Sequence, residues 1–129
     1  MIQIKVFNFH HGYIQKKSLS SLYMSSSKIL FVEEEKFIGL IAGIDTIIDL
    51  SNNSISGDMS NVLLNAHHII LGHNNFTGTL PHLLPKVGYV DLSHNYFKGL
   101  IPHGWKNLKH LYFISLWNNN LFSEVLVKL

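Results

Sequence analysis

Histidine is the residue type with the widest chemical repertoire in this chain, which contains nine histidines and no cysteine. His73 and His94 occupy equivalent places in two similar segments, so an ion shared between them is one hypothesis. Two imidazoles without a third ligand do not make a zinc site, and we therefore predict no bound metal and no other cofactor. A second hypothesis is pH sensing, since a histidine side chain titrates at about pH 6.5.

Serine, histidine and aspartate also build hydrolytic active sites, but here none of them stands in a catalytic motif. The chain has no Gly-x-Ser-x-Gly, no HExxH, no kinase motif and no glycine-rich phosphate loop followed by lysine. Without cysteine it has no thiolate nucleophile and no disulfide framework. The same residue types recur at fixed repeat positions instead. We therefore predict that the protein is not an enzyme.

Composition excludes several classes of partner. Of the 129 residues, 47% are apolar and 14% are charged, and the formal net charge is +2. This balance, without a basic cluster, argues against nucleic-acid binding. The longest apolar stretch, residues 37–50, contains two aspartates and two glycines. It is shorter than the roughly 20 residues of a membrane helix, so we expect no direct membrane insertion. Residues 1–6 alternate like a strand and do not have the pattern of a secretory signal.

Three segments of the chain repeat one pattern of residue types. Asn53, Asn74 and Asn95 mark the same place in each segment, and their spacing is constant, with 74 − 53 = 21 and 95 − 74 = 21. Apolar residues stand at the same offsets before and after each asparagine. A period of about 20–29 residues with this pattern is typical of a leucine-rich repeat. The three segments are residues 48–57, 69–78 and 90–99.

Each repeat predicts a short strand that cannot bury its apolar residues alone. Alternate residues of a strand point to opposite sides, so Ile48 and Leu50 would point inward and Asp49 outward. Neighbouring repeats must stack on this apolar row, which gives a solenoid. An asparagine side chain both donates and accepts, so successive asparagines would satisfy backbone groups at the turn as a ladder. The ladder positions are Ser27, Asn53, Asn74, Asn95 and Asn119, with a weaker rung at the shorter serine.

The fold class that we predict is α/β: a leucine-rich-repeat solenoid with a parallel concave sheet and with loops or short helical turns on the convex side. Residues 1–17 are interpreted as a degenerate or truncated first unit and residues 18–129 as the repeat array. Apolar residues at helical spacing behind three glutamates predict a helical insertion at residues 33–43, which Gly43 would end. No polar capping segment is recognisable, so we expect uncapped ends and a fragment of a longer array. The predicted units lie near residues 19–31, 45–60, 66–81, 87–102 and 108–126.

The residues that follow two of the ladder asparagines are similar to the plant-specific form of the repeat. Residues 76–81 and 97–102 both read apolar-x-Gly-x-apolar-Pro. On these motifs, residues 49–129 resemble the ectodomain of plant leucine-rich-repeat receptor-like proteins, and among them the group that includes the fungal-xylanase receptors. Ser60 and Ser123 depart from the pattern, because proline and glycine are expected at these two places.

The resemblance implies a location and a role. Receptor-like proteins of this family lie on the extracellular side of the plasma membrane and act in defence or developmental signalling. They carry many more repeats, a single membrane helix and a short cytoplasmic tail. If the chain is secreted, two sequons would be used for glycosylation, one at Asn52 and one at Asn75.

A solenoid of this kind binds through its concave strand surface. The outward positions of successive repeats fall into four columns, and neighbouring strands lie about 4.8 Å apart, so a ligand would touch several columns. The first column is Ile47, His68, Tyr89 and Phe113, and the second is Asp49, Ile70, Asp91 and Ser115. The third is Ser51, Gly72, Ser93 and Trp117, and the fourth is Asn52, His73, His94 and Asn118.

We expect the aromatic residues of these columns to anchor a ligand and the histidines and an aspartate to be polar partners. The alternative for any single position is an ordinary solvent-facing strand residue. The predicted binding residues are Asp49, Ser51, His68, Ile70, His73, Tyr89, Asp91, His94, Phe113, Ser115 and Trp117.

The function that follows is ligand binding by a fragment of a plant cell-surface receptor-like protein. The expected partner is a protein or peptide, with a co-receptor as a further candidate. One alternative is a secreted, non-signalling repeat protein of the inhibitor type. Another is a truncated gene copy without independent activity.

Overall fold

The computed structural model describes residues 21–26, 39 and 41–122 of the chain. Several predictions lie outside these residues: the first unit at residues 1–17, the ladder position Ser27, and most of the helical insertion at residues 33–43. Within that insertion, residues 39, 41 and 42 are helical and Gly43 forms a turn.

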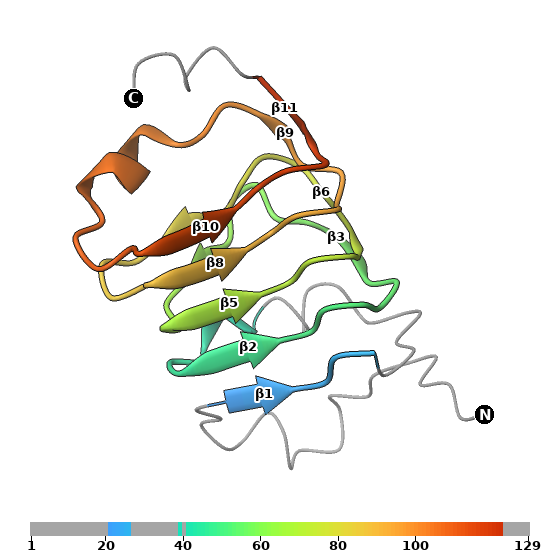
Figure 1. Ribbon diagram of the computed structural model, residues 1–129, viewed down its shortest axis with the longest axis horizontal. Coiled ribbons are helices and arrows are strands. Elements are labelled where there is room, and N and C mark those ends of the chain that lie inside the picture. Colours follow the sequence, from blue (N-terminus) through green and yellow to red (C-terminus); the bar gives the residue numbers. More distant parts are fainter. Residues whose placement is uncertain (1–20, 27–38, 40, 123–129) are drawn as a thin grey trace.

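Five short parallel strands form the main sheet, in the order β1-β2-β5-β8-β10 (Figure 1). Each turn of the chain contributes one strand, and the chain then passes behind the sheet before it returns to form the next strand. The molecule is therefore a solenoid of stacked coils, as predicted. The strands are β1 (Ser21–Tyr23), β2 (Ile47–Asp49), β5 (His68–Ile70), β8 (Tyr89–Asp91) and β10 (Phe113–Ser115).

The apolar core lies directly behind this sheet. Ile48, Ile69 and Val90 pair in register at the centres of β2, β5 and β8, and all three are fully buried. Behind the turn, the rings of Phe76 and Phe97 stack at 6.5 Å between centroids and are also fully buried. One apolar column thus runs through consecutive coils, which no single coil could bury alone.

The asparagine ladder joins each coil to the one before it. Asn74 Nδ2 donates to the carbonyl of Leu50 on the preceding coil at 2.9 Å and to that of Leu71 on its own coil at 3.1 Å. Asn74 Oδ1 accepts from the backbone N–H of Ile55 at 3.0 Å. One buried side chain therefore satisfies three backbone groups on two coils.

The other described ladder residues repeat this geometry. Asn95 Oδ1 accepts from Phe76 N–H and Asn119 Oδ1 accepts from Phe97 N–H, each at 3.0 Å. Asn53 Nδ2 donates to the carbonyl of Met24 at 2.9 Å. The ladder thus runs from the coil of β1 to the coil of β10 in the part of the chain that the structure describes.

The convex side differs from the prediction of loops or short helical turns. Three further parallel strand pairs lie there, and besides the helical residues 39, 41 and 42 the described residues contain one short helix, the 3-10 helix η1 (His103–Asn107). A coil of 21 residues is too short for a long helix, so the backbone stays extended and pairs with the next coil, as in Asn75 N–H to Ile55 O at 2.8 Å. The pairs are β3 (Ser56–Asp58) with β6 (Asn75–Thr77), β4 (Leu63–Leu64) with β7 (His82–Leu83), and β9 (Lys98–Gly99) with β11 (Asn120–Leu121).

Gly78 is required where β6 ends. Its φ of +86° lies in the left-handed region, and a Cβ atom built there would lie 2.1 Å from Asp58 Oδ1 and 2.5 Å from Ser60 Oγ. Ser60 in turn fixes this corner, because its N–H donates to Asp58 Oδ1 and its Oγ accepts from Thr79 N–H. The glycine of the repeat motif therefore serves close coil-to-coil packing at this corner.

Candidate functional site

The outward side of β2, β5, β8 and β10, called the concave face below, carries the predicted columns side by side. In the first column, the rings of Tyr89 and Phe113 stack at 4.2 Å and 8°. His68 meets the Tyr89 ring edge-on at 5.6 Å. Ile47 pairs with His68 in the strand register. Three neighbouring strands thus present one continuous row of rings.

The second column places two carboxylates at the ends of β2 and β8. Asp49 Oδ1 accepts from the hydroxyl of Ser51 at 2.8 Å, and Asp91 Oδ1 accepts from that of Ser93 at 2.6 Å. The backbone N–H groups of both serines donate to the same carboxylate oxygens. The aspartates are therefore held in place before any ligand arrives. Ile70 and Ser115 complete the column and are partly buried.

Two of the four members of the third column are covered by their neighbours and are not open to solvent. Gly72 and Ser93 are buried. A Cβ atom at Gly72 would lie 3.2 Å from Asp91 Oδ1 and from Ser93 Oγ, so the missing side chain makes room for the aspartate–serine pair on the next coil. Trp117, in the same column, is 69% exposed.

The fourth column forms the turn that follows each strand. Asn52, His73, His94 and Asn118 all have left-handed φ angles, from 56° to 61°. The rings of His73 and His94 stack at 3.9 Å with 14° between their planes, and Trp117 meets the His94 ring edge-on at 4.7 Å. Asn118 Nδ2 is hydrogen-bonded to His94 Nδ1.

The stacked histidines are not arranged to share an ion. Their rings lie in nearly parallel planes, so their nitrogen lone pairs, which lie in those planes, do not converge on one point. Among the described residues, no group of three or more His, Asp or Glu side chains is placed to hold a metal.

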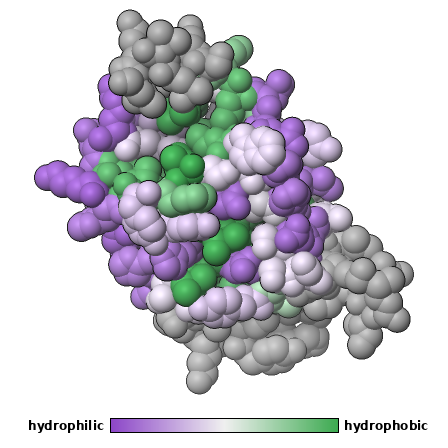
Figure 2. Space-filling view, viewed as in Figure 1, coloured by the Kyte–Doolittle hydropathy of each residue, from purple (hydrophilic) through white to green (hydrophobic). Residues whose placement is uncertain are grey.

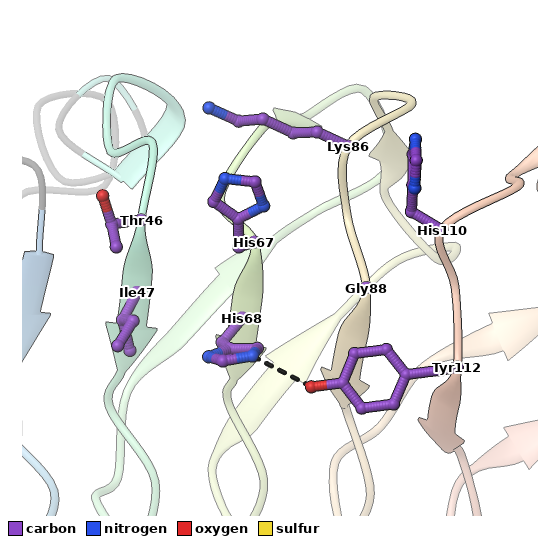
Figure 3. A pocket seen from close by; sticks show the side chains of 8 residues that line it. All are labelled: Thr46, Ile47, His67, His68, Lys86, Gly88, His110 and Tyr112. Carbon is purple, nitrogen blue, oxygen red and sulfur yellow. Dashed lines mark hydrogen bonds between the residues drawn. The ribbon is translucent and has the colours of Figure 1, made fainter.

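A pocket at the beginning of the strands was not predicted. It has a volume of about 510 Å³ and lies beside the first column (Figure 3). In Figure 3 the Tyr112 ring points toward His68, and Tyr112 Oη lies 3.0 Å from His68 Nε2. We call this cavity the edge pocket. Its lining residues are Thr46, Ile47, His67, His68, Lys86, Gly88, His110 and Tyr112.

The sequence did contain a signal for the edge pocket. Thr46, His67, Gly88 and Tyr112 each stand one residue before the first column, so they form a column of their own. Strict alternation assigned this column to the interior. The regular ladder is broken before β10, however, because the N–H groups of Tyr112 and Phe113 both donate to the carbonyl of Gly88, and Tyr112 is 71% exposed. Alternation holds only within the three residues of each strand.

Comparison with protein-family models gave a match at residues 86–108 to the Leucine Rich Repeat. The chain contains a leucine-rich repeat. The match covers β8, β9 and η1, and thus one complete coil. The comparison with curated proteins found no match, and the comparison with solved structures found none either.

Leucine-rich-repeat solenoids are typically binding scaffolds for other proteins, without enzymatic activity of their own. Figure 2 shows the corresponding surface: apolar side chains along the middle of the viewed face, with hydrophilic ones on both sides. The sequon residues Asn52 and Asn75 are both exposed. No helix in the described part of this leucine-rich-repeat chain is long and apolar enough to cross a membrane.

Proposed function

We propose that the chain is a protein- or peptide-binding module that takes its ligand on the concave face. The observation that carries this proposal is the row of accessible rings on that face. Phe113 is 39% exposed and Trp117 is 69% exposed, although side chains of this size are usually buried. Ring stacking between Tyr89 and Phe113 holds the row in one conformation, which lowers the entropy lost when a ligand binds.

The wider context that we propose is a plant cell-surface receptor-like protein, on the extracellular side of the plasma membrane, in defence or developmental signalling. The motifs at residues 76–81 and 97–102 support this assignment, because they are similar to the plant-specific repeat. The exposure of Asn52 and Asn75 supports it as well, since both sequons are accessible to glycosylation. A co-receptor would be a second partner, beside the ligand.

The experiment that tests ligand binding is selection of peptides from a random displayed library on the purified chain. Peptides that bind the concave face should lose about tenfold or more in affinity for Trp117→Ala and for Phe113→Ala, because buried aromatic anchors contribute most of the binding energy of an interface. Tyr96→Ala is the matched control, since Tyr96 is 64% exposed but lies outside the four columns. Selected peptides that bind all three variants equally well would contradict the proposal.

A further inference from the structure

The edge pocket lies next to the aromatic row of the concave face, but its lining includes one lysine and three histidines. Its side chains come from the segments that lead into four consecutive strands, β2, β5, β8 and β10. It opens beside Tyr89, because the Tyr112 ring lies 6.1 Å from the Tyr89 ring. A ligand on the concave face can therefore reach into the pocket without leaving the row of rings.

Most of the surface that lines the edge pocket is apolar, and several of its polar side chains are hydrogen-bond donors. Lys86 supplies a charged ammonium with three N–H donors, and every imidazole, including those of His67 and His110, has at least one N–H in either tautomer. In Figure 3 the Lys86 side chain runs above the His67 ring, with His110 on the other side of Gly88. None of the residues that line the pocket is an aspartate or a glutamate. The polar part of the lining therefore favours a ligand group with acceptors and negative charge.

The carboxylates of the concave face do not neutralise this charge. Asp49 and Asp91 stand three residues further along their strands than Thr46 and Gly88, a distance of about 10 Å. That is about one Debye length at physiological ionic strength, so their effect on the pocket is largely screened. Asp45 lies closer, because its exposed carboxylate accepts from the hydroxyl of the pocket-lining Thr46 at 3.1 Å, and it therefore places one negative charge beside the pocket.

The shape of the pocket depends on Gly88. A Cβ atom at this position would lie 3.0 Å from Tyr112 Cε1 and 3.1 Å from the carbonyl oxygen of His110. A larger residue would therefore press on the Tyr112 ring and fill the floor between the two histidine segments. Glycine leaves that floor open between Lys86 and the Tyr112 ring.

We propose that the edge pocket binds the side-chain carboxylate of an acidic residue in a peptide ligand, while the neighbouring ligand residue packs on Tyr89 and Phe113. Lys86 supplies the charge for this carboxylate, and His67 and His110 supply further donors. The proposal rests on the proposed function, because it names the part of a peptide ligand that the beginning of the concave strands selects.

Two short peptides test the pocket directly: N-acetyl-Glu-Phe-amide and its neutral counterpart N-acetyl-Gln-Phe-amide. Each is titrated into the ¹⁵N-labelled chain at physiological ionic strength and followed by NMR. The Glu peptide should shift the amide signals of residues 86–88 and 110–112 and bind about tenfold more tightly than the Gln peptide, because a charge-assisted hydrogen bond is about twice as strong as a neutral one. Equal affinities, or shifts only at other residues, would overturn the proposal.

A pair of lysine variants identifies the group responsible. Lys86→Met keeps the apolar stem and removes the ammonium, so it should bring the affinity for the Glu peptide down to that for the Gln peptide. Lys106→Met is the matched control, because Lys106 is exposed in η1 and does not line the pocket. Lys106→Met should leave the affinity for the Glu peptide unchanged.

His110→Gln is a second pocket variant at an exposed position, and it should lower the affinity for the Glu peptide about threefold. Unchanged binding by Lys86→Met, with both variants folded by circular dichroism, would contradict a carboxylate site.

Inorganic phosphate distinguishes another source of negative charge. If phosphate binds the same residues more tightly than the Glu peptide does, the pocket selects a phosphorylated ligand and the acidic-residue proposal falls.

The library-peptide and Glu-peptide experiments together separate a failure of the edge-pocket proposal from a failure of the proposed function. If library peptides lose affinity for Trp117→Ala but bind Lys86→Met normally, the proposed function stands and the edge-pocket proposal is contradicted. If the Glu peptide binds the pocket but library peptides bind Trp117→Ala and Phe113→Ala normally, the edge-pocket proposal stands and binding on the aromatic row is contradicted.

Discussion

At the scale of single residues, asparagine does what backbone pairing cannot do at the turn of each coil. Asn74 is buried and bonds the carbonyls of Leu50 and Leu71 and the N–H of Ile55. No other neutral side chain of this size offers two donors and an acceptor from one planar group, apart from the longer glutamine. This explains why the same residue type returns at a fixed spacing.

Asn74→Ala should lower the free energy of unfolding by about 2–4 kcal/mol, because it leaves several buried backbone groups without partners. Its exposed neighbour gives a matched control, and Asn75→Ala should change stability by less than about 0.5 kcal/mol. Urea denaturation followed by circular dichroism measures both. Similar losses in the two variants would show that the ladder carries little of the stability.

Gly78→Ala should lower the free energy of unfolding by about 2 kcal/mol or more, since it combines a left-handed φ with a collision at Asp58 Oδ1. Gly104→Ala is the control, because a Cβ atom there would meet nothing within 4 Å. The second variant should be as stable as the parent chain or slightly more stable. Thermal melts of the two proteins would contradict this argument if they coincided.

The Asp58 carboxyl makes the stability of the same corner depend on pH. Hydrogen bonds from the side chain and backbone of Ser60 lower the pKa of the Asp58 carboxyl below its ordinary value of 3.8, and Lys98 adds a smaller effect in the same direction. A lowered pKa in the folded state stabilises the fold above the unfolded-state pKa, and this stability is lost as the pH falls through the folded-state pKa. Asp58→Asn should therefore flatten the loss of stability on acidification below about pH 4. Parallel acid-denaturation curves for Asp58→Asn and the parent chain would contradict this origin.

At the scale of elements, the strands are too short to be stable alone, since each strand of the main sheet has three residues. Their stability comes from the side chains that stack behind the turns. Phe76→Ala removes a fully buried ring that stacks on Phe97, and it should lower the free energy of unfolding by about 3–5 kcal/mol. Tyr96 is the exposed residue next to Phe97, and Tyr96→Ala should lower the free energy of unfolding by less than about 1 kcal/mol. Chemical denaturation of both variants measures the difference.

The repeat spacing also decides which elements could be predicted. Because 21 residues separate equivalent positions, the pairing of Ile47 with His68 and of His68 with Tyr89 follows from the sequence alone. The convex strands could not be found this way, because their register departs from the period of 21 residues: Ser56 pairs with Asn75 (75 − 56 = 19) and Lys98 pairs with Asn120 (120 − 98 = 22). The edge pocket was missed because alternation does not extend to Tyr112: the N–H groups of Tyr112 and Phe113 both donate to the carbonyl of Gly88, which spacing does not encode. The burial of Ser93 could not be predicted either, since Ser51 makes the same bonds to its aspartate and is only partly buried.

At the scale of the whole molecule, the proposal of an extracellular protein makes a covalent prediction. Expressed with a signal sequence in a eukaryotic secretory host, the chain should carry N-linked glycan on Asn75 and on Asn52, since both are exposed. Mass spectrometry before and after enzymatic removal of glycans detects this. Asn75→Gln and Asn52→Gln should each remove one glycan. A secreted, folded chain without glycan at either position would count against the extracellular assignment.

The residues that follow the strands have left-handed φ angles, which affect the stability of the fold. A non-glycine residue in this conformation loses about 1–2 kcal/mol relative to a right-handed one, and glycine would avoid most of that loss. His73 and His94 nevertheless occupy such positions, with φ of 60° and 56°. Glycine, in turn, loses more conformational entropy on folding. The two histidine rings stack on each other at 3.9 Å, so contact between neighbouring coils offsets part of the backbone strain at these turns.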